Sequence, residues 1–118
     1  MAKAEHKDFK SPDEVRNFEK GKLELLKMGD GEIGLLTLEP GWRWSEHVKS
    51  IAKTDWCEAP HFQYQLSGKL HVKMTDGEEF ETTEGHVAWV PSGHDAWVVG
   101  NEKVVLVDWS GAKQYAKH

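Results

Sequence analysis

Closely spaced turn residues constrain the fold of this chain more than any other feature. Turns rich in Gly, Pro, Asn and Asp recur from Gly29-Asp30-Gly31 to Gly100-Asn101 and leave only short stretches between them. About eight to ten short strands at such spacing are typical of a β-sandwich or β-barrel. The sequence therefore predicts an all-β fold.

The strands expected between these turns can be placed by range. They are residues 23–28, 33–38, 42–49, 61–66, 69–75, 79–83, 87–90, 96–99 and 104–109. The last two ranges flank Gly100-Asn101, which predicts a final hairpin.

One short helix is predicted near the N-terminus. Ser11-Pro12-Asp13-Glu14 combines a capping serine, a proline suited to the first turn and a glutamate that can close a capping box. Val15 and Phe18 add an apolar pair at helical spacing, so the helix is expected to end before Gly21. We expect a flexible lead-in over residues 1–10, one domain over 11–111 and a flexible tail over 112–118.

Composition narrows the class of protein. A chain of 118 residues suits one domain, and its net charge of −5 argues against a nucleic-acid partner. No apolar run approaches the length of a membrane span, and the charged N-terminus does not resemble a secretory signal. The single Cys57 cannot form an internal disulfide, which favours the cytoplasm.

The stretch 61–66 alternates between two unlike faces. His61, Gln63 and Gln65 lie on one face, while the opposite face carries Phe62, Tyr64 and Leu66. The polar face either contacts solvent or lines a polar cavity inside a barrel.

Two spaced motifs then resemble those of the cupins. Gly41, five residues and His47 resemble the start of the first cupin motif, and His61 to Gly68 resembles its end. Gly85, five residues and Pro91-x-Gly93 resemble the second motif. The resemblance covers about residues 23–109. It implies a single-domain jelly-roll barrel (a double-stranded β-helix), often dimeric, that commonly holds a divalent metal between three His and one Glu.

The expected ligand positions depart from that pattern. Lys49 stands where the second His of the cupin His-x-His pair would be, and His61 occupies the position of the Glu. The His of the second motif would fall at Ala96, and His94 lies two residues earlier, on the same face of an extended strand.

A metal site is one hypothesis that these residues support. His47, His61 and His94 would supply three imidazoles, a set that suits Zn, Fe, Ni or Cu. Gln63 or Cys57 would be either a fourth ligand or a residue that contacts the ligands without binding the metal itself. On this hypothesis the chain is a metal-dependent enzyme that acts on a small polar metabolite.

The alternative is a site without a metal. The chain would then bind or sense a small carboxylate and would not catalyse a reaction. Lys49 beside His47 would form a cationic pocket. Lys49 and Cys57 are also candidate catalytic residues, as a base or nucleophile and as a thiolate. The predicted pocket residues are Trp44, Lys49, Gln63, Tyr64 and Trp97. We also expect a homodimer, because exposed sheet edges invite pairing; a purely structural dimer is a third interpretation.

Overall fold

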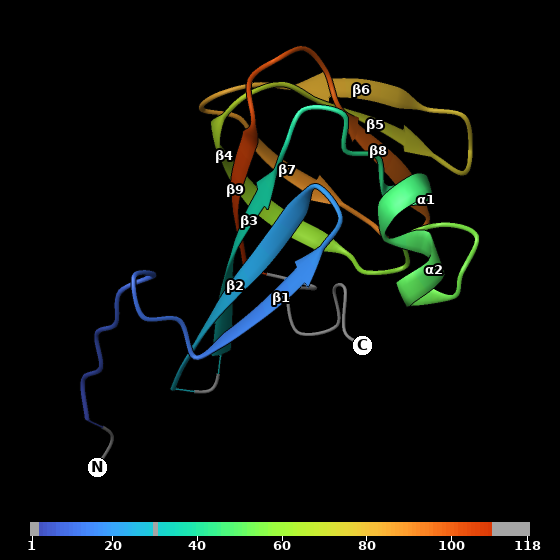
Figure 1. Ribbon diagram of the computed structural model, residues 1–118. Helices are drawn as coiled ribbons and strands as arrows, with labels where there is room; N and C mark the ends of the chain where they lie inside the picture. Colours follow the sequence, from blue (N-terminus) through green and yellow to red (C-terminus); the bar gives the residue numbers. More distant parts are fainter. Residues whose placement is uncertain (1–2, 30, 110–118) are drawn as a thin grey trace.

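The computed structural model describes residues 3–29 and 31–109, in which strands predominate (Figure 1). The elements are β1 (Glu14–Phe18), β2 (Gly21–Met28), β3 (Gly31–Leu38), α1 (Trp44–His47), α2 (Lys49–Ala52), β4 (His61–Ser67), β5 (Leu70–Met74), β6 (Glu79–Thr82), β7 (Val87–Val90), β8 (His94–Val98) and β9 (Val104–Asp108). This arrangement confirms the predicted all-β fold.

The strands form two antiparallel sheets. A six-stranded sheet has the order β1-β2-β3-β9-β4-β7, and a three-stranded sheet has the order β6-β5-β8. Among the described residues no strand pairing joins the two sheets, so the jelly roll is not a closed barrel. One core cluster joins them, with Leu36 and Leu106 from the larger sheet and Leu70 and Val72 from the smaller one.

Strand β4 places its polar face inside. His61, Gln63 and Gln65 are each at most 6% exposed, whereas Phe62 and Tyr64 point outward. The amide of Gln65 donates to the carbonyls of Gly68 and Thr82, and its oxygen accepts a hydrogen bond from the Thr82 hydroxyl. These bonds satisfy a buried amide and link the two sheets.

The predicted N-terminal helix is wrong, because residues 14–18 form strand β1. β1 pairs with β2 from Glu14↔Leu25 to Phe18↔Gly21, so the backbone groups that a helix would use bond to a neighbouring strand. The Asp13 carboxylate accepts hydrogen bonds from the Lys27 backbone N–H and the Lys7 ammonium, and so ties the start of β1 to the end of β2.

The range 42–49, predicted to be extended, contains the helical turn α1 and the start of α2. The carboxylate of Asp95, on β8, accepts the Ser45 N–H and so satisfies a free donor at the first turn of α1. The predicted hairpin across Gly100-Asn101 is also wrong: β8 pairs with β5, whereas β9 pairs with β3 and β4. The chain crosses there from one sheet to the other.

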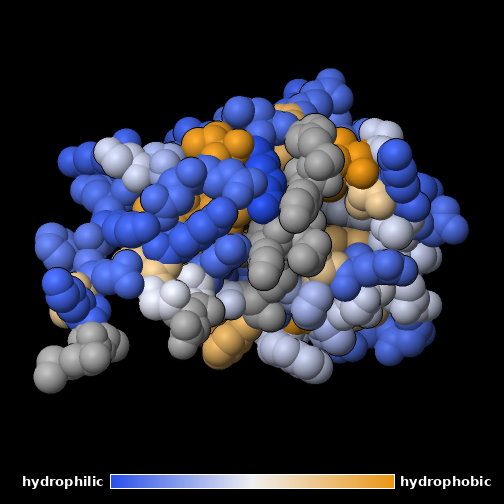
Figure 2. Space-filling model, turned by 90° about the horizontal axis from the view of Figure 1, so that it is seen from below, coloured by the Kyte–Doolittle hydropathy of each residue, from blue (hydrophilic) through white to orange (hydrophobic). Residues whose placement is uncertain are grey.

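The lead-in contacts the sheet. Lys7 donates to the carbonyl of Lys27, and Glu5 accepts the Gly29 N–H. The predicted tail over 112–118 lies outside the described residues. Within those residues no helix is long and apolar enough to cross a membrane. The surface in Figure 2 is mainly hydrophilic, with hydrophobic residues in separate patches.

Candidate metal centre

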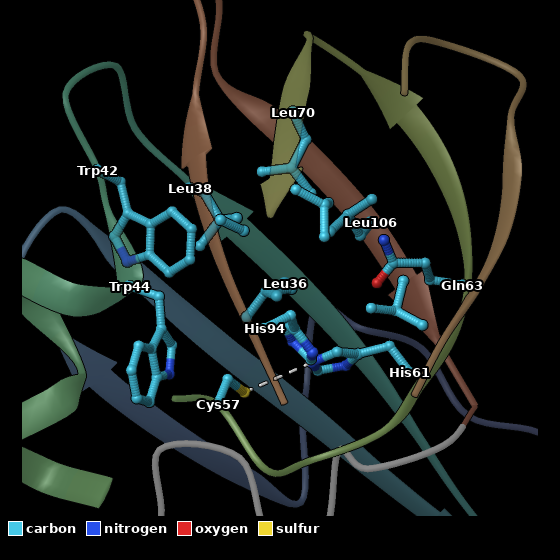
Figure 3. Close-up of a pocket in the computed structure, with 13 residues that line it drawn as sticks. Leu36, Leu38, Trp42, Trp44, Cys57, His61, Gln63, Leu70, His94 and Leu106 are labelled. Atoms are coloured by element: carbon cyan, nitrogen blue, oxygen red, sulfur yellow. Dashed lines mark hydrogen bonds between the residues drawn. The ribbon is translucent and has the colours of Figure 1, made fainter. Parts of the chain in front are cut away.

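A small cavity lies between the two sheets. It has a volume of about 30 Å³, which is room for one or two water molecules. Most of its wall is apolar, and its polar groups come from Cys57, His61, Gln63 and His94. The indole rings of Trp42 and Trp44 form part of the wall (Figure 3). The polar side chains His61 and Gln63 on the inner face of β4 therefore line a cavity within the core.

Three potential metal ligands converge at this cavity. Cys57 Sγ and one ring nitrogen from each of His61 and His94 all lie within 4.8 Å of one another. Cys57 Sγ is 3.9 Å from His61 Nε2, and the two imidazole rings are 5.1 Å apart at an interplanar angle of 62°. Figure 3 shows the three side chains pointing toward one another. All three residues are buried.

The outer nitrogen of each imidazole is already bonded. His61 Nδ1 lies 2.5 Å from the Asp108 carboxylate, and His94 Nδ1 lies 3.0 Å from the Pro91 carbonyl oxygen. Both partners accept hydrogen bonds, so each Nδ1 carries its proton. In the neutral ring the lone pair is then on Nε2. Metal-binding histidines in proteins are held in this way.

Without a metal, Cys57 and His61 form an ion pair. Burial alone would raise the pKa of the Cys57 thiol, but hydrogen bonds to His61 and His94 and their positive charge lower it to about 6. Burial alone would lower the pKa of His61, but its hydrogen bonds to Asp108 and Cys57, with their negative charges, raise it to about 9. Near neutral pH the pair is therefore a thiolate beside an imidazolium.

The donor set fits a divalent transition metal. In a tetrahedral zinc site with one sulfur ligand, neighbouring ligand atoms are roughly 3.5 Å apart, given the usual Zn–S and Zn–N lengths. The spacing of the three atoms here exceeds that value by at most about 1.3 Å. The three atoms would therefore have to move closer together to bind one ion.

His47 does not lie with the other two predicted histidine ligands. It ends α1, where its Nδ1 accepts the backbone N–H of Arg43 at 3.0 Å. Its Nε2 is 3.6 Å from a carboxylate oxygen of Glu19, in the turn between β1 and β2. The helical turn over 44–47 accounts for this position, because the predicted set depended on an extended chain. Cys57 occupies the place in the cluster that the sequence assigned to His47.

Two of the five predicted pocket residues line the cavity. Trp44 and Gln63 line it. Lys49 lies instead on the surface at the start of α2, with its Nζ 3.7 Å from Asp55. Tyr64 is on the outward face of β4, opposite Gln63. Trp97 points away from the core, where its ring stacks on His71 and lies 4.1 Å from the Arg43 guanidinium.

Two features of the site were missed in the sequence. Asp108, the buried partner of His61, was predicted only as part of a strand. Its role depends on the register Gln63↔Asp108 between β4 and β9, which is a long-range pairing. Cys57 was predicted as a fourth ligand or as a residue supporting the ligands, but its position directly beside His94 was not predicted. That position is set by a backbone bridge to His94, in which the N–H and carbonyl groups of the two residues bond reciprocally.

Comparisons with known proteins identify the fold and leave the activity open. No protein-family model and no curated protein sequence matches the chain. Among solved structures, the oxalate decarboxylase of Lactobacillus farciminis in its formate complex is 16% identical, with a TM-score of 0.64 over 86% of this chain. The Bacillus subtilis oxalate decarboxylase at pH 4.6 is 24% identical, with a TM-score of 0.57 over 87% of this chain.

The chain spans about a third of the length of these two decarboxylases, 32% and 28% respectively. A protein of unknown function from Rhizobium leguminosarum is closer in size. It is 18% identical with a TM-score of 0.59, over 77% of this chain and 80% of that one. Likeness at such identities shows the fold alone.

Proposed function

The chain has the cupin fold, and on that premise we propose that it binds one divalent transition metal ion and acts on a small polar molecule. Cys57, His61 and His94 would be the ligands. The observation that carries the proposal is the orientation of both imidazoles. Each ring is fixed by a hydrogen bond at Nδ1, which leaves Nε2 for the cavity.

The ligand chemistry favours zinc, copper, iron or nickel over manganese. Thiolate and imidazole are the softer donors, whereas manganese prefers oxygen ligands. The Bacillus subtilis oxalate decarboxylase is described as having Mn(II) centres. We propose that this chain differs in its metal, with zinc as the best match to two imidazoles and one thiolate.

The metal would polarise an oxygen-bearing ligand and lower the pKa of a bound water. The surrounding residues have separate roles. Asp108 holds His61 in one orientation, and Trp42 and Trp44 keep bulk water away from the cavity. The side-chain amide of Gln63 lines the same cavity. It carries one acceptor and two donors, which would orient a bound polar molecule.

The cavity volume limits that molecule to a few non-hydrogen atoms. The alternative carboxylate-binding module depended on Lys49, which does not line the cavity. A thiolate ligand also suits a reducing compartment, so we place the protein in the cytoplasm.

The proposal is tested by measuring metal content in protein purified without an affinity tag. We expect one metal ion per chain, with the thiolate-to-metal absorption band of the Co²⁺-substituted form as a second readout. His94→Ala and Cys57→Ser should each lose the metal, and Cys57→Ser should remove the band. His47→Gln is the matched control and should retain both. Substoichiometric metal after incubation with Zn²⁺ or Co²⁺, or equal loss in His47→Gln, contradicts the proposal.

The Asp108–His61–Cys57 arrangement favours a second candidate, a thiol nucleophile. In that case His61 would act as the base and Asp108 would orient it. A small alkylating agent should then modify metal-free Cys57 near neutral pH, and His61→Gln should slow the reaction. A metal-independent activity lost in Cys57→Ser would favour this candidate over the metal site.

A further inference from the structure

The donor atoms at the cavity match a second class of metal site besides zinc. One sulfur and two ring nitrogens, from Cys57, His61 and His94, face one point in the core. Two imidazoles and one thiolate in a trigonal arrangement are typical of the copper sites that carry single electrons. Such sites add a weak fourth ligand at a longer distance, which is a thioether, an amide or a backbone oxygen.

Gln63 supplies a donor of that fourth kind. It lies two residues after His61 on the inner face of β4, is 4% exposed and lines the same cavity. Figure 3 shows its amide pointing into the cavity from the strand that carries His61. An amide oxygen binds copper more weakly than a thiolate or an imidazole, so it suits the distant position.

The small, closed cavity suits an exchange of electrons. Its volume of about 30 Å³ is largely taken up once an ion is bound, and the wall is mostly apolar, with Trp42 and Trp44 on one side. A reaction on a substrate needs room beside the ion, whereas a change in the charge of the ion needs none. Apolar surroundings penalise charge, so this wall favours Cu⁺ over Cu²⁺.

The protein also limits how far the ligands can move. His61 is fixed at Nδ1 by Asp108, and His94 is fixed at Nδ1 by the Pro91 carbonyl. The main-chain bridge between Cys57 and His94 holds those two residues together. Ligands held in this way move little when the ion gains or loses an electron, which keeps the exchange fast.

A bonded route connects the buried site to the surface. One carboxylate oxygen of Asp108 bonds His61, and the other accepts the backbone N–H of Phe62. Trp109 follows Asp108 in the chain, and its ring centre lies 6.3 Å from that of Phe62. Phe62 is 50% exposed and Trp109 is 52% exposed. An electron carrier that contacts these two rings is therefore joined to a ligand of the metal through covalent and hydrogen bonds.

We propose that this site, when it holds copper, is a one-electron redox centre in which Cys57, His61 and His94 are the strong ligands and Gln63 is the weak fourth ligand. The inference rests on the metal site proposed above and adds what the same residues do when the ion is copper. Cu²⁺ takes up one electron and becomes Cu⁺, which later returns the electron; no proton moves and no bond to a substrate forms. The donor and the acceptor are one-electron carriers, represented below by ascorbate and ferricyanide.

Addition of Cu²⁺ to the metal-free full chain tests the inference. We expect one copper ion per chain, an intense visible band from thiolate-to-copper charge transfer, and a small copper hyperfine splitting in the electron paramagnetic resonance spectrum. Ascorbate should bleach the band and ferricyanide should restore it over repeated cycles. Cys57→Ser should remove the band, and His47→Gln is the control that should keep it.

Gln63→Leu tests the fourth ligand. Loss of the amide oxygen should raise the midpoint reduction potential, because this donor stabilises Cu²⁺ more than Cu⁺. Leucine is close to glutamine in size and joins an apolar wall, so the far-ultraviolet circular dichroism spectrum should not change. Tyr64→Phe, on the opposite face of β4, is the matched control and should keep the wild-type potential. An unchanged potential in Gln63→Leu overturns the assignment of Gln63.

Two spectroscopic outcomes overturn the redox centre while the metal site stands. One is bound copper with weak visible absorption and a large hyperfine splitting, in a chain that still takes up one Zn²⁺. The other is a band that ascorbate bleaches and ferricyanide does not restore, with Cys57 found oxidised by mass spectrometry. A chain that takes up neither Cu²⁺ nor Zn²⁺ overturns the metal site and the redox centre together.

Discussion

Asp108 contributes to the site without facing the cavity. One carboxylate oxygen bonds His61 Nδ1, and the other accepts the Phe62 backbone N–H at 3.2 Å. Only 2% of the residue is exposed. A buried carboxylate in this position fixes the imidazole ring and makes its other nitrogen a stronger electron donor.

Asp108→Asn should weaken metal binding about 10- to 100-fold, because the amide keeps the shape but loses the negative charge. Competition with a coloured chelator measures the dissociation constant. Asp13→Asn removes a carboxylate on the far side of β2 and should leave the affinity unchanged. Unaltered affinity in Asp108→Asn would show that the carboxylate does not tune the ligand.

His71 makes part of the protein's stability depend on pH. Partial burial alone would lower its pKa, but hydrogen bonds to Glu81 and Glu79, 3.0 and 2.8 Å away, raise it. Folding therefore favours the protonated ring. The stabilisation is complete below the unfolded value of about 6.5 and is lost as the pH rises through the higher folded value.

We expect the stability difference between the wild type and His71→Gln to shrink by up to about 1 kcal/mol between about pH 6 and about pH 9. Urea unfolding at the two pH values measures it. The packing of the ring on Trp97 is lost at both pH values, so the change between them reports the charge of the ring, including its cation–π attraction to Trp97. Lys73→Gln on the same strand should show no such change. An unchanged difference for His71→Gln would contradict the charge pairing.

At the scale of the element, Gly68 allows the chain to pass from β4 to β5. Its φ is +78°, and a Cβ there would lie 2.6 Å from the Lys103 carbonyl oxygen and 2.8 Å from a methyl group of Val104. Gly77, between β5 and β6, has φ of +94° with nothing within 4 Å of its Cβ position. A side chain at Gly77 would therefore introduce backbone strain alone, whereas a side chain at Gly68 would add steric overlap to that strain.

Gly77→Ala should cost about 1–2 kcal/mol of unfolding free energy, the usual cost of a left-handed backbone. Gly68→Ala should cost about 1–3 kcal/mol more, because backbone and β9 must also shift. Denaturant titration of both variants measures the difference. Equal costs would mean that the β4–β5 connection relaxes freely.

Elements were predictable where the signal is local. The alternation in 61–66 and the turns around it identified β4 correctly, apart from its last residue. The segment from Ser11 to Phe18 has good local helix signals, yet pairing with β2 prevails. The helical turn that begins at Trp44 was not predicted, because the carboxylate that stabilises it, Asp95, lies on a strand fifty residues later in the chain.

At the scale of the whole molecule, the sequence predicted the fold but only part of the site. The spacing of turns is sufficient to indicate a two-sheet β protein. Which face of β4 lies inside depends on contacts between distant strands, and alternation alone left that question open. The grouping of His61 and His94 was predicted, whereas the cluster position of Cys57 depends on its bridge to β8.

The backbone bridge between Cys57 and His94 also affects how a metal ion would bind and dissociate. The Cys57 N–H bonds the His94 carbonyl, and the N–H groups of Gly93 and His94 bond the Cys57 carbonyl. Main-chain pairing, rather than the ion, therefore holds the two ligands side by side. Little ordering entropy would remain to be lost on metal binding, so the chain would take up or release an ion without refolding around it.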